Sequence, residues 1–314
     1  MTNTATMEKA RGAWSSDGAQ AQVFSGHESF ACRYGWLVKL YHALAEDPDL
    51  FADDDHAILT LGLGKNMVKS IRFWGGAFGL TRQIKRQTLN TRFAQRLFDP
   101  KIGHDPYLED AGSLWRLHWH VAVHAGLGAW VIAVQDLLDA RISRDRLVDL
   151  AESRAAAAQR PISRNTAAAH IDIFLRTYDW SRSEGGTAAE EGANSPFQEL
   201  RLLETAHHNG SALVSFNRGP KQDLKLNDLA FALGDFWAGT ARASAQLSMR
   251  TLQLDKRGPA TIFRLDEGSL HVMIEQLAKE AGLFLDSDGA GGAALVARSG
   301  DHLERLEALA WPNT

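Results

Sequence analysis

The chain has 314 residues and a formal net charge of −4, because 38 acidic residues face 34 Lys and Arg. Its length is enough for two or three domains, and an apolar content of 45% with nine Trp indicates well-packed cores. A single cysteine, Cys32, excludes an internal disulfide and a cysteine zinc cluster, and no apolar run is long enough to span a membrane, so we expect a cytoplasmic protein without membrane partners.

The first segments combine a low-complexity tail with a polar motif. Residues 1–22 are rich in Ala, Ser, Thr and Gly, which predicts a disordered tail. His27 and Glu28 follow, just before a predicted helix at 34–45. A His beside a carboxylate can act as a base or bind a metal, and it can equally cap a helix.

A basic window lies between Leu61 and Phe98, where eight basic residues occur without one Asp or Glu. Outside this window 26 basic residues face 38 acidic ones, so the remainder sums to −12. The contrast predicts one surface for a polyanion such as DNA, and the alternative is a solvated face that happens to be basic.

Within the window, residues 65–78 have the periodicity of an amphipathic helix. Lys65, Lys69 and Arg72 share one stripe at i, i+4 and i+7. Four apolar residues occupy nearly the opposite stripe, namely Met67, Ile71, Trp74 and Phe78. The apolar side should therefore face a core while the cationic side stays free, and the segment itself has no carboxylate to pair those charges.

The elements around this helix have the order of a helix-turn-helix unit. A short helix opened by Asp53–Asp55 and a glycine turn at 61–64 precede it, and residues 80–88 predict a β-hairpin wing. We therefore interpret 23–100 as an N-terminal winged helix-turn-helix module. Its predicted DNA-binding residues are Lys65, Asn66, Lys69, Arg72, Arg82, Lys85 and Arg86, with the Asn66 amide able to read a base edge.

An acidic segment follows the basic window, with carboxylates at Asp105, Glu109 and Asp110. Carboxylates beside a phosphate-binding surface suit metal-dependent phosphodiester cleavage, with Mg²⁺ or another divalent metal as cofactor. The alternative is a structural turn in which Asp110 caps the next helix.

Two further motifs have structural interpretations that we favour. His118, His120 and His124 lie in an apolar helical segment, where hydrogen-bonded core histidines are more common than metal ligands. The turn with Arg218 and Lys221, followed by Lys225, could extend a phosphate track, although exposed turn charges are the default explanation.

The remaining chain divides by composition and periodicity. Residues 101–180 predict a helical middle region, 181–196 a flexible linker, and 197–314 a C-terminal α/β winged-helix-like region with a helix near 266–281 and two strands. The expected fold is thus mainly α with small β-hairpins, as tandem winged-helix-like modules around a helical middle.

Three blocks resemble one bacterial protein family, the SspB family of the Ssp DNA phosphorothioation and phage-defence system. The blocks are Gly26–Phe30 with Arg33–Leu37, Leu61–Val68 with Ser70–Trp74, and Asp105–Asp110 with Leu114–Trp119. They span about the first 125 residues, and the likeness thins toward the C-terminus.

The resemblance implies a DNA-nicking component that works with a desulfurase and ATP-using partner proteins. It brings no catalytic assignment, so the candidate catalytic residues rest on their own chemistry: His27, Glu28, Asp105, Glu109 and Asp110. Two other classes stay open, namely a non-catalytic helix-turn-helix regulator or loader on DNA, and an assembly protein whose basic face meets an acidic partner.

Overall fold

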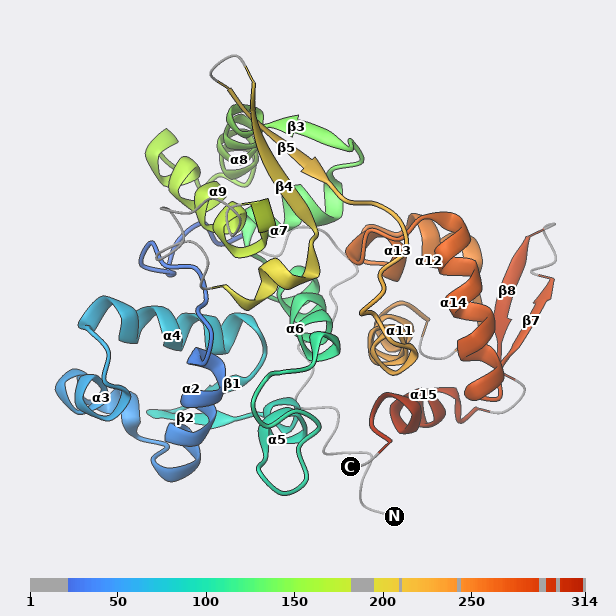
Figure 1. The fold of residues 1–314 in the computed structure, drawn as a ribbon, viewed down its shortest axis with the longest axis horizontal. Coiled ribbons are helices and arrows are strands. Elements are labelled where there is room, and N and C mark those ends of the chain that lie inside the picture. Colours follow the sequence, from blue (N-terminus) through green and yellow to red (C-terminus); the bar gives the residue numbers. More distant parts are fainter. Residues whose placement is uncertain are drawn as a thin grey trace.

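The computed structural model describes residues 22–181, 195–208, 211–241, 244–287, 292–297 and 300–312. Helices predominate there, and the strands form three small antiparallel sheets (Figure 1). The expectation of a mainly α protein with small β-hairpins is confirmed. The predicted tail at 1–22 and linker at 181–196 lie almost entirely outside the described residues. None of the helices in these ranges is both long and apolar enough to cross a membrane.

The N-terminal part follows the predicted element order. Asp53 caps one helix by accepting hydrogen bonds from the backbone N–H groups of Asp55 and His56, and Gly62 ends that helix in the left-handed region at φ +61°. The elements are α2 (Trp36–Glu46), η1 (Leu50–Ala52), α3 (Asp54–Leu61), α4 (Lys65–Ala77), β1 (Thr81–Ile84), β2 (Gln87–Asn90) and α5 (Arg92–Phe98).

The predicted hairpin is present, with β1 antiparallel to β2 and Arg82 opposite Leu89. The N–H of Thr88 donates to the carbonyl of Pro48, which fixes the hairpin to the segment before η1. The helices and strands that a winged helix-turn-helix requires are therefore in place, while that architecture itself stays a prediction.

The middle of the chain is helical, apart from one short strand that the sequence did not reveal. Its elements are α6 (Ala111–His124), α7 (Gly128–Trp130), the π-helical η2 (Val131–Asp136), β3 (Arg141–Ser143), α8 (Arg144–Ala157), α9 (Arg164–Tyr178) and η4 (Pro196–Leu200). The strand β3 pairs with β5 in the sheet β3-β5-β4, where β4 is Leu203–His208 and β5 is Ser211–Phe216. Residues on both sides of the predicted linker therefore share one sheet.

The C-terminal part contains the predicted helix and hairpin with a third strand beside them. The sheet order is β6-β8-β7. Its elements are α11 (Leu226–Ala241), β6 (Gln246–Ser248), α12 (Met249–Leu254), α13 (Pro259–Ile262), α14 (Glu267–Glu280), β7 (Phe284–Ser287), β8 (Ala293–Val296) and α15 (His302–Ala310).

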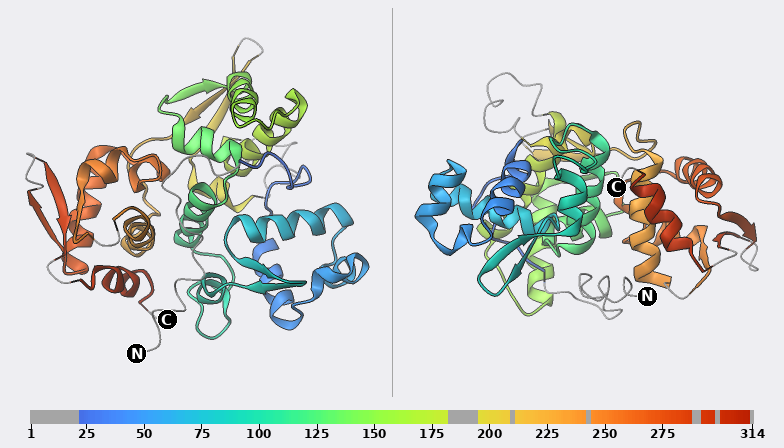
Figure 2. Two further views of the ribbon diagram at one scale, coloured as in Figure 1. Left: turned by 180° about the vertical axis from the view of Figure 1, so that it is seen from behind. Right: turned by 90° about the horizontal axis from the view of Figure 1, so that it is seen from below.

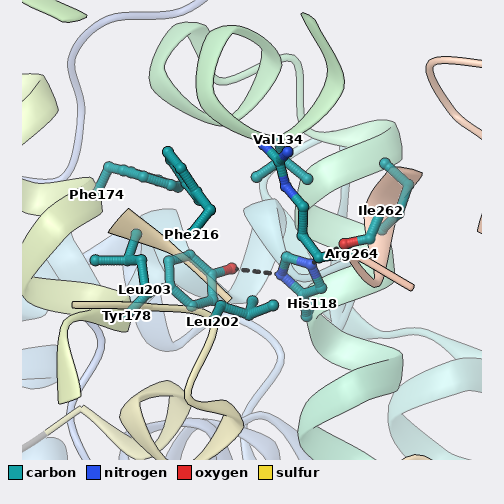
Figure 3. A pocket seen from close by; sticks show the side chains of 9 residues that line it. All are labelled: His118, Val134, Phe174, Tyr178, Leu202, Leu203, Phe216, Ile262 and Arg264. Carbon is teal, nitrogen blue, oxygen red and sulfur yellow. Dashed lines mark hydrogen bonds between the residues drawn. The ribbon is translucent and has the colours of Figure 1, made fainter. Parts of the chain in front are cut away.

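Helix α6 lies centrally, between the N-terminal elements on one side and the C-terminal elements on the other (Figures 1 and 2). A buried hydrogen-bond relay joins it to its neighbours. The indole N–H of Trp130 donates to the Tyr178 hydroxyl at 3.0 Å, and that hydroxyl lies 2.8 Å from Nδ1 of His118 (Figure 3). Nε2 of His118 lies 3.0 Å from the carbonyl oxygen of Ile262, so the relay connects α7, α9, α6 and α13.

Candidate nucleic-acid interface

The cationic stripe of α4 lies on the exposed side of that helix. Ile71 and Trp74 are fully buried on the other side, as the periodicity predicts, and the Trp74 indole donates to the Phe30 carbonyl at 3.0 Å. Lys69 and Arg72 are both exposed. Arg72 lies over the ring of Phe51, with Cζ 5.2 Å from the ring centroid.

One member of the stripe departs from the expectation. Lys65 forms an ion pair with Asp54 of α3, with Nζ 3.2 Å from Oδ2, so the expectation that the cationic side stays free was wrong at this position, although α4 itself has no carboxylate. The short helix returns an acidic residue to the start of α4, which the sequence of α4 alone does not reveal. Because both side chains are more than 60% exposed, the pair is weak and a phosphate can compete for Lys65.

The first turn of α4 adds backbone donors beside these side chains. Gly64 is the N-cap and provides no side-chain hydrogen bond to the free N–H groups of the first turn. Asn66 is exposed in the same turn. The positive end of a 13-residue helix therefore lies beside Lys65 and Asn66, an arrangement that favours an anion such as a phosphate.

The hairpin contributes the second group of cations. Arg82, Lys85 and Arg86 are all exposed, and Lys85 occupies the turn at φ +56°. In the described part of the chain, no carboxylate lies within ion-pair distance of Lys69, Arg72 or any of these three residues. We call Lys69, Arg72, Arg82, Lys85 and Arg86 the unpaired cationic set.

The last two cations of the basic window have a different role. Arg96 Nη1 lies 2.6 Å from Oε1 of Glu307 in α15, and Arg92 lies 3.9 Å from the same oxygen. Arg96 also lies over the Trp311 ring. These contacts connect the window to the C-terminal helix, so part of the positive charge is structural.

The His27 motif has a structural partner far away in sequence. Nε2 of His27 lies 3.0 Å from Nδ1 of His170 in α9, and Nδ1 of His27 accepts from the Ser29 N–H at 3.2 Å. His27 is buried and burial lowers its pKa to about 4, with the charge of Glu28 opposing that shift. Glu28 is exposed, so the two predicted catalytic residues point into different environments.

The acidic segment forms a rigid turn. Asp105 is buried, and its two carboxylate oxygens accept the N–H groups of Glu109 and Asp110 at 2.9 and 3.0 Å. Asp110 caps α6 through the Gly112 N–H, and its two oxygens each lie 2.9 Å from Nζ of Lys225. Leu108 is buried at φ +59°, and Glu109 is exposed. These contacts confirm that Asp110 caps α6. They also show that Lys225 is held by Asp110 in an ion pair.

This donor set does not form a ready-made cage for a divalent cation. The oxygens of Asp105 and Asp110 accept hydrogen bonds from N–H groups and an ammonium, and Glu109 is the one carboxylate of the three without such a contact in the described structure. Mg²⁺ is usually held by one or two carboxylates together with several waters, so Glu109 would hold it only with water and phosphate as further ligands. Throughout the described ranges, no group of three or more His, Cys, Asp or Glu side chains is placed to hold a metal.

The histidines of α6 are mostly structural, as expected. His118 is fully buried in the relay, and burial lowers its pKa to about 4. Nε2 of His124 lies 2.7 Å from Oδ2 of Asp235 in α11, and the same oxygen accepts the Trp119 indole N–H at 2.9 Å. His120 packs against the ring of Phe93.

One charged pair was missed by the sequence reasoning. Arg116 and Asp228 are both buried, and Nε of the arginine lies 2.6 Å from Oδ1 of the aspartate. The Arg116 guanidinium also lies 4.4 Å from the Trp311 ring centroid. An Arg inside an otherwise apolar helix is the one sequence signal that pointed to a buried partner.

Comparisons with known proteins agree over nearly the whole chain. Residues 24–310 match the family described as "Protein of unknown function (DUF4007)". A magnesium ion-bound SspB crystal structure superimposes with a TM-score of 0.82 at 28% identity, covering 94% of this chain and 89% of that one. A second SspB crystal structure gives a TM-score of 0.79 at 26% identity with the same coverage. The search of curated proteins finds no match.

Proposed function

Because this chain belongs to the DUF4007 family and shares the SspB fold, we propose that it is the DNA-binding and DNA-nicking component of a phosphorothioate modification and defence system. The observation that carries the proposal is the unpaired cationic set, exposed on a helix and a hairpin whose other sides are fixed to the core. DNA is the polyanion that fits a surface of this kind in an otherwise acidic chain.

Different residues of the surface contact different parts of the DNA in this proposal. Lys69 and Arg72 contact phosphates from α4, and Lys65 joins them when a phosphate displaces Asp54. Asn66 is exposed in the first turn of α4, so the helix N-terminus can hold a phosphate while the Asn66 amide contacts a base edge. Arg82, Lys85 and Arg86 extend the contact along the backbone from the hairpin.

For the nicking step we propose Glu109 as the carboxylate that activates water. Among the predicted catalytic residues it combines exposure with a fixed position, because Asp105 holds the turn on which it lies. Asp105 and Asp110 then position Glu109, and His27 holds the N-terminal segment on α9. The related SspB structure contains magnesium, but we assign no step to a metal here because, among the described residues, no group of three or more metal-ligating side chains is placed to hold one.

The partners of the proposed function are DNA and the proteins of the same system, a desulfurase and ATP-using components. A modification enzyme that inserts sulfur into the backbone needs access to a phosphodiester, and a nick in one strand supplies such access.

A plasmid-relaxation assay with and without EDTA tests the activity. Conversion of supercoiled plasmid to open circles, abolished by Glu109→Gln with unchanged DNA affinity, is the expected result. Glu280→Gln, which neutralises an exposed carboxylate at the end of α14, is the matched control and should leave nicking unchanged. Binding without nicking would instead support a regulator or loader, and absence of DNA binding would support an assembly protein.

Gel-shift titrations over a range of salt concentrations test the surface. Lys69→Gln with Arg72→Gln should weaken binding and reduce the slope of log affinity against log salt by about two, since each lost phosphate contact removes about one. Lys279→Gln, an exposed lysine on α14, is the matched control and should leave the slope unchanged. Equal slopes in all three proteins would contradict the assigned surface.

A further inference from the structure

A second group of cations gathers at the turn between β5 and α11. Arg218 is exposed in this turn, and Lys221 is half-buried at its end. Nζ of Lys221 donates to the carbonyl of Asn217 at 2.7 Å. The N–H of Gly219 donates to the carbonyl of Arg264 at 3.0 Å, which places the segment before α14 against the turn.

Arg264 is the buried member of the group, with 3% of its surface exposed. Its guanidinium donates to the carbonyls of Leu137 and Ala133, and it lies over Phe216 with Cζ 4.6 Å from the ring centroid (Figure 3). The residue adopts φ +54°, a conformation that is unfavourable for a long side chain. The carbonyl dipoles solvate this charge but do not neutralise it.

The three cations are not balanced by acids. In the described ranges, no carboxylate oxygen lies within ion-pair distance of Arg218, Lys221 or Arg264. The acid that faces Lys221 is Asp266, and its carboxylate caps α14 by accepting from the N–H and hydroxyl of Ser269 at 2.7 and 3.1 Å. Burial and the neighbouring charge of Arg264 lower the pKa of Lys221 to about 8, and burial and Arg218 lower the pKa of Arg264 to about 10.

We propose that Arg218, Lys221 and Arg264 form a phosphate-binding site, separate from the unpaired cationic set of the N-terminal part. A dianion at the turn would meet the exposed guanidinium of Arg218 and the ammonium of Lys221, while the fixed charge of Arg264 acts from behind. It would also relieve the repulsion among three cations, none of which has an acid at ion-pair distance in the described ranges. The phosphate belongs either to a DNA backbone or to a small free molecule.

Acylation of lysines at pH 8, followed by peptide mass spectrometry, tests this site. A lysine with a pKa near 8 is about half neutral at that pH, so Lys221 should react quickly. Bound phosphate keeps it protonated, and a rise of its pKa by one unit slows labelling about fivefold. The probes are inorganic phosphate and a single-stranded DNA oligonucleotide, each compared with NaCl at equal ionic strength, and the exposed Lys279 is the internal reference.

We expect inorganic phosphate to slow labelling of Lys221 about fivefold, and Arg218→Gln to raise the concentration needed for half-protection about tenfold. Protection by both probes, or by the oligonucleotide alone, identifies a backbone phosphate, and protection by inorganic phosphate alone identifies a free one. The assay is repeated in the double variant Lys69→Gln with Arg72→Gln. Protection of Lys221 that persists in this variant does not depend on the proposed DNA surface. Labelling that neither probe slows, or equal protection in Arg218→Gln, would overturn the site.

Discussion

Charged side chains of this protein occur in two different environments. Lys69 and Arg72 are exposed without an acid nearby, whereas Arg116 is buried against Asp228. A charge that is left unpaired in solvent adds little to stability, so stability does not account for these two residues. The buried charge of Arg116 is matched by an acid that lies more than a hundred residues away in the sequence.

The histidine His118 makes stability depend on pH. Its folded pKa of about 4 lies below the unfolded value near 6.5, because burial disfavours the imidazolium. Unfolded chains take up a proton below pH 6.5 and the folded chain does not, so this contribution to stability is complete above pH 6.5 and falls as pH drops toward 4. Between pH 7.5 and pH 5 the free energy of unfolding should fall by about 2 kcal/mol from this residue.

Urea unfolding of the wild type and His118→Gln at both pH values measures that difference. The variant loses two hydrogen bonds and is less stable at pH 7.5, but its stability should fall about 2 kcal/mol less on going to pH 5. Parallel losses in the two proteins would show that His118 is protonated equally in both states.

The elements were largely predictable where a local signal existed. The 3.6-residue periodicity fixed α4, Asp53–Asp55 located the start of α3, and the basic segment 80–88 is the hairpin. The strand β3 has three residues and becomes a strand only by pairing with β5, some seventy residues later. Pairing between distant segments leaves no local pattern, so neither this sheet nor the Lys65–Asp54 pair was predicted.

Because contacts between distant segments leave no local pattern, only part of the candidate site could be predicted from the sequence. Exposure of the α4 stripe was predicted because it follows from periodicity. Of the six cations among the predicted DNA-binding residues, Lys65 has an acid partner in the described structure and the other five form the unpaired cationic set. The role of the acidic segment was ambiguous, because carboxylates that bind a metal and carboxylates that hold a turn give the same sequence pattern. Only the hydrogen bonds of Asp105 show that it holds the turn.

Helix α4 packs closely on α2 through one of two adjacent glycines, which gives a matched pair of variants. A Cβ at Gly75 would overlap Cδ2 of Leu40, which is fully buried, and would lie 3.1 Å from Thr81 Cγ2. A Cβ at Gly76 meets nothing within 4 Å. Gly75→Ala should therefore destabilise by about 1–3 kcal/mol, and Gly76→Ala should stabilise by up to about 1 kcal/mol. Thermal unfolding compares the two, and equal effects would contradict the close helix contact.

At the scale of the whole molecule, α6 and α11 join the N-terminal and C-terminal elements. The Arg116–Asp228 pair lies in this contact, His124–Asp235 joins the same two helices, and Lys225–Asp110 joins the residues that directly precede them. Glu307 and Trp311 add a second connection to α5 and α6. The proposed DNA surface and the proposed phosphate site are therefore held on one framework, which fixes their positions relative to each other.

The buried pair should control the stability of this framework. Asp228→Ala leaves the Arg116 charge buried without its partner, which should destabilise the protein by about 3–5 kcal/mol. Replacing both residues, as Arg116→Met with Asp228→Leu, removes the desolvation penalty together with the attraction and should recover most of that loss. Denaturant titrations of Arg116→Met, of Asp228→Leu and of the double variant give the coupling energy. If the double variant loses as much stability as the two single variants summed, the pair does not hold α6 to α11, and the framework depends on its aromatic contacts instead.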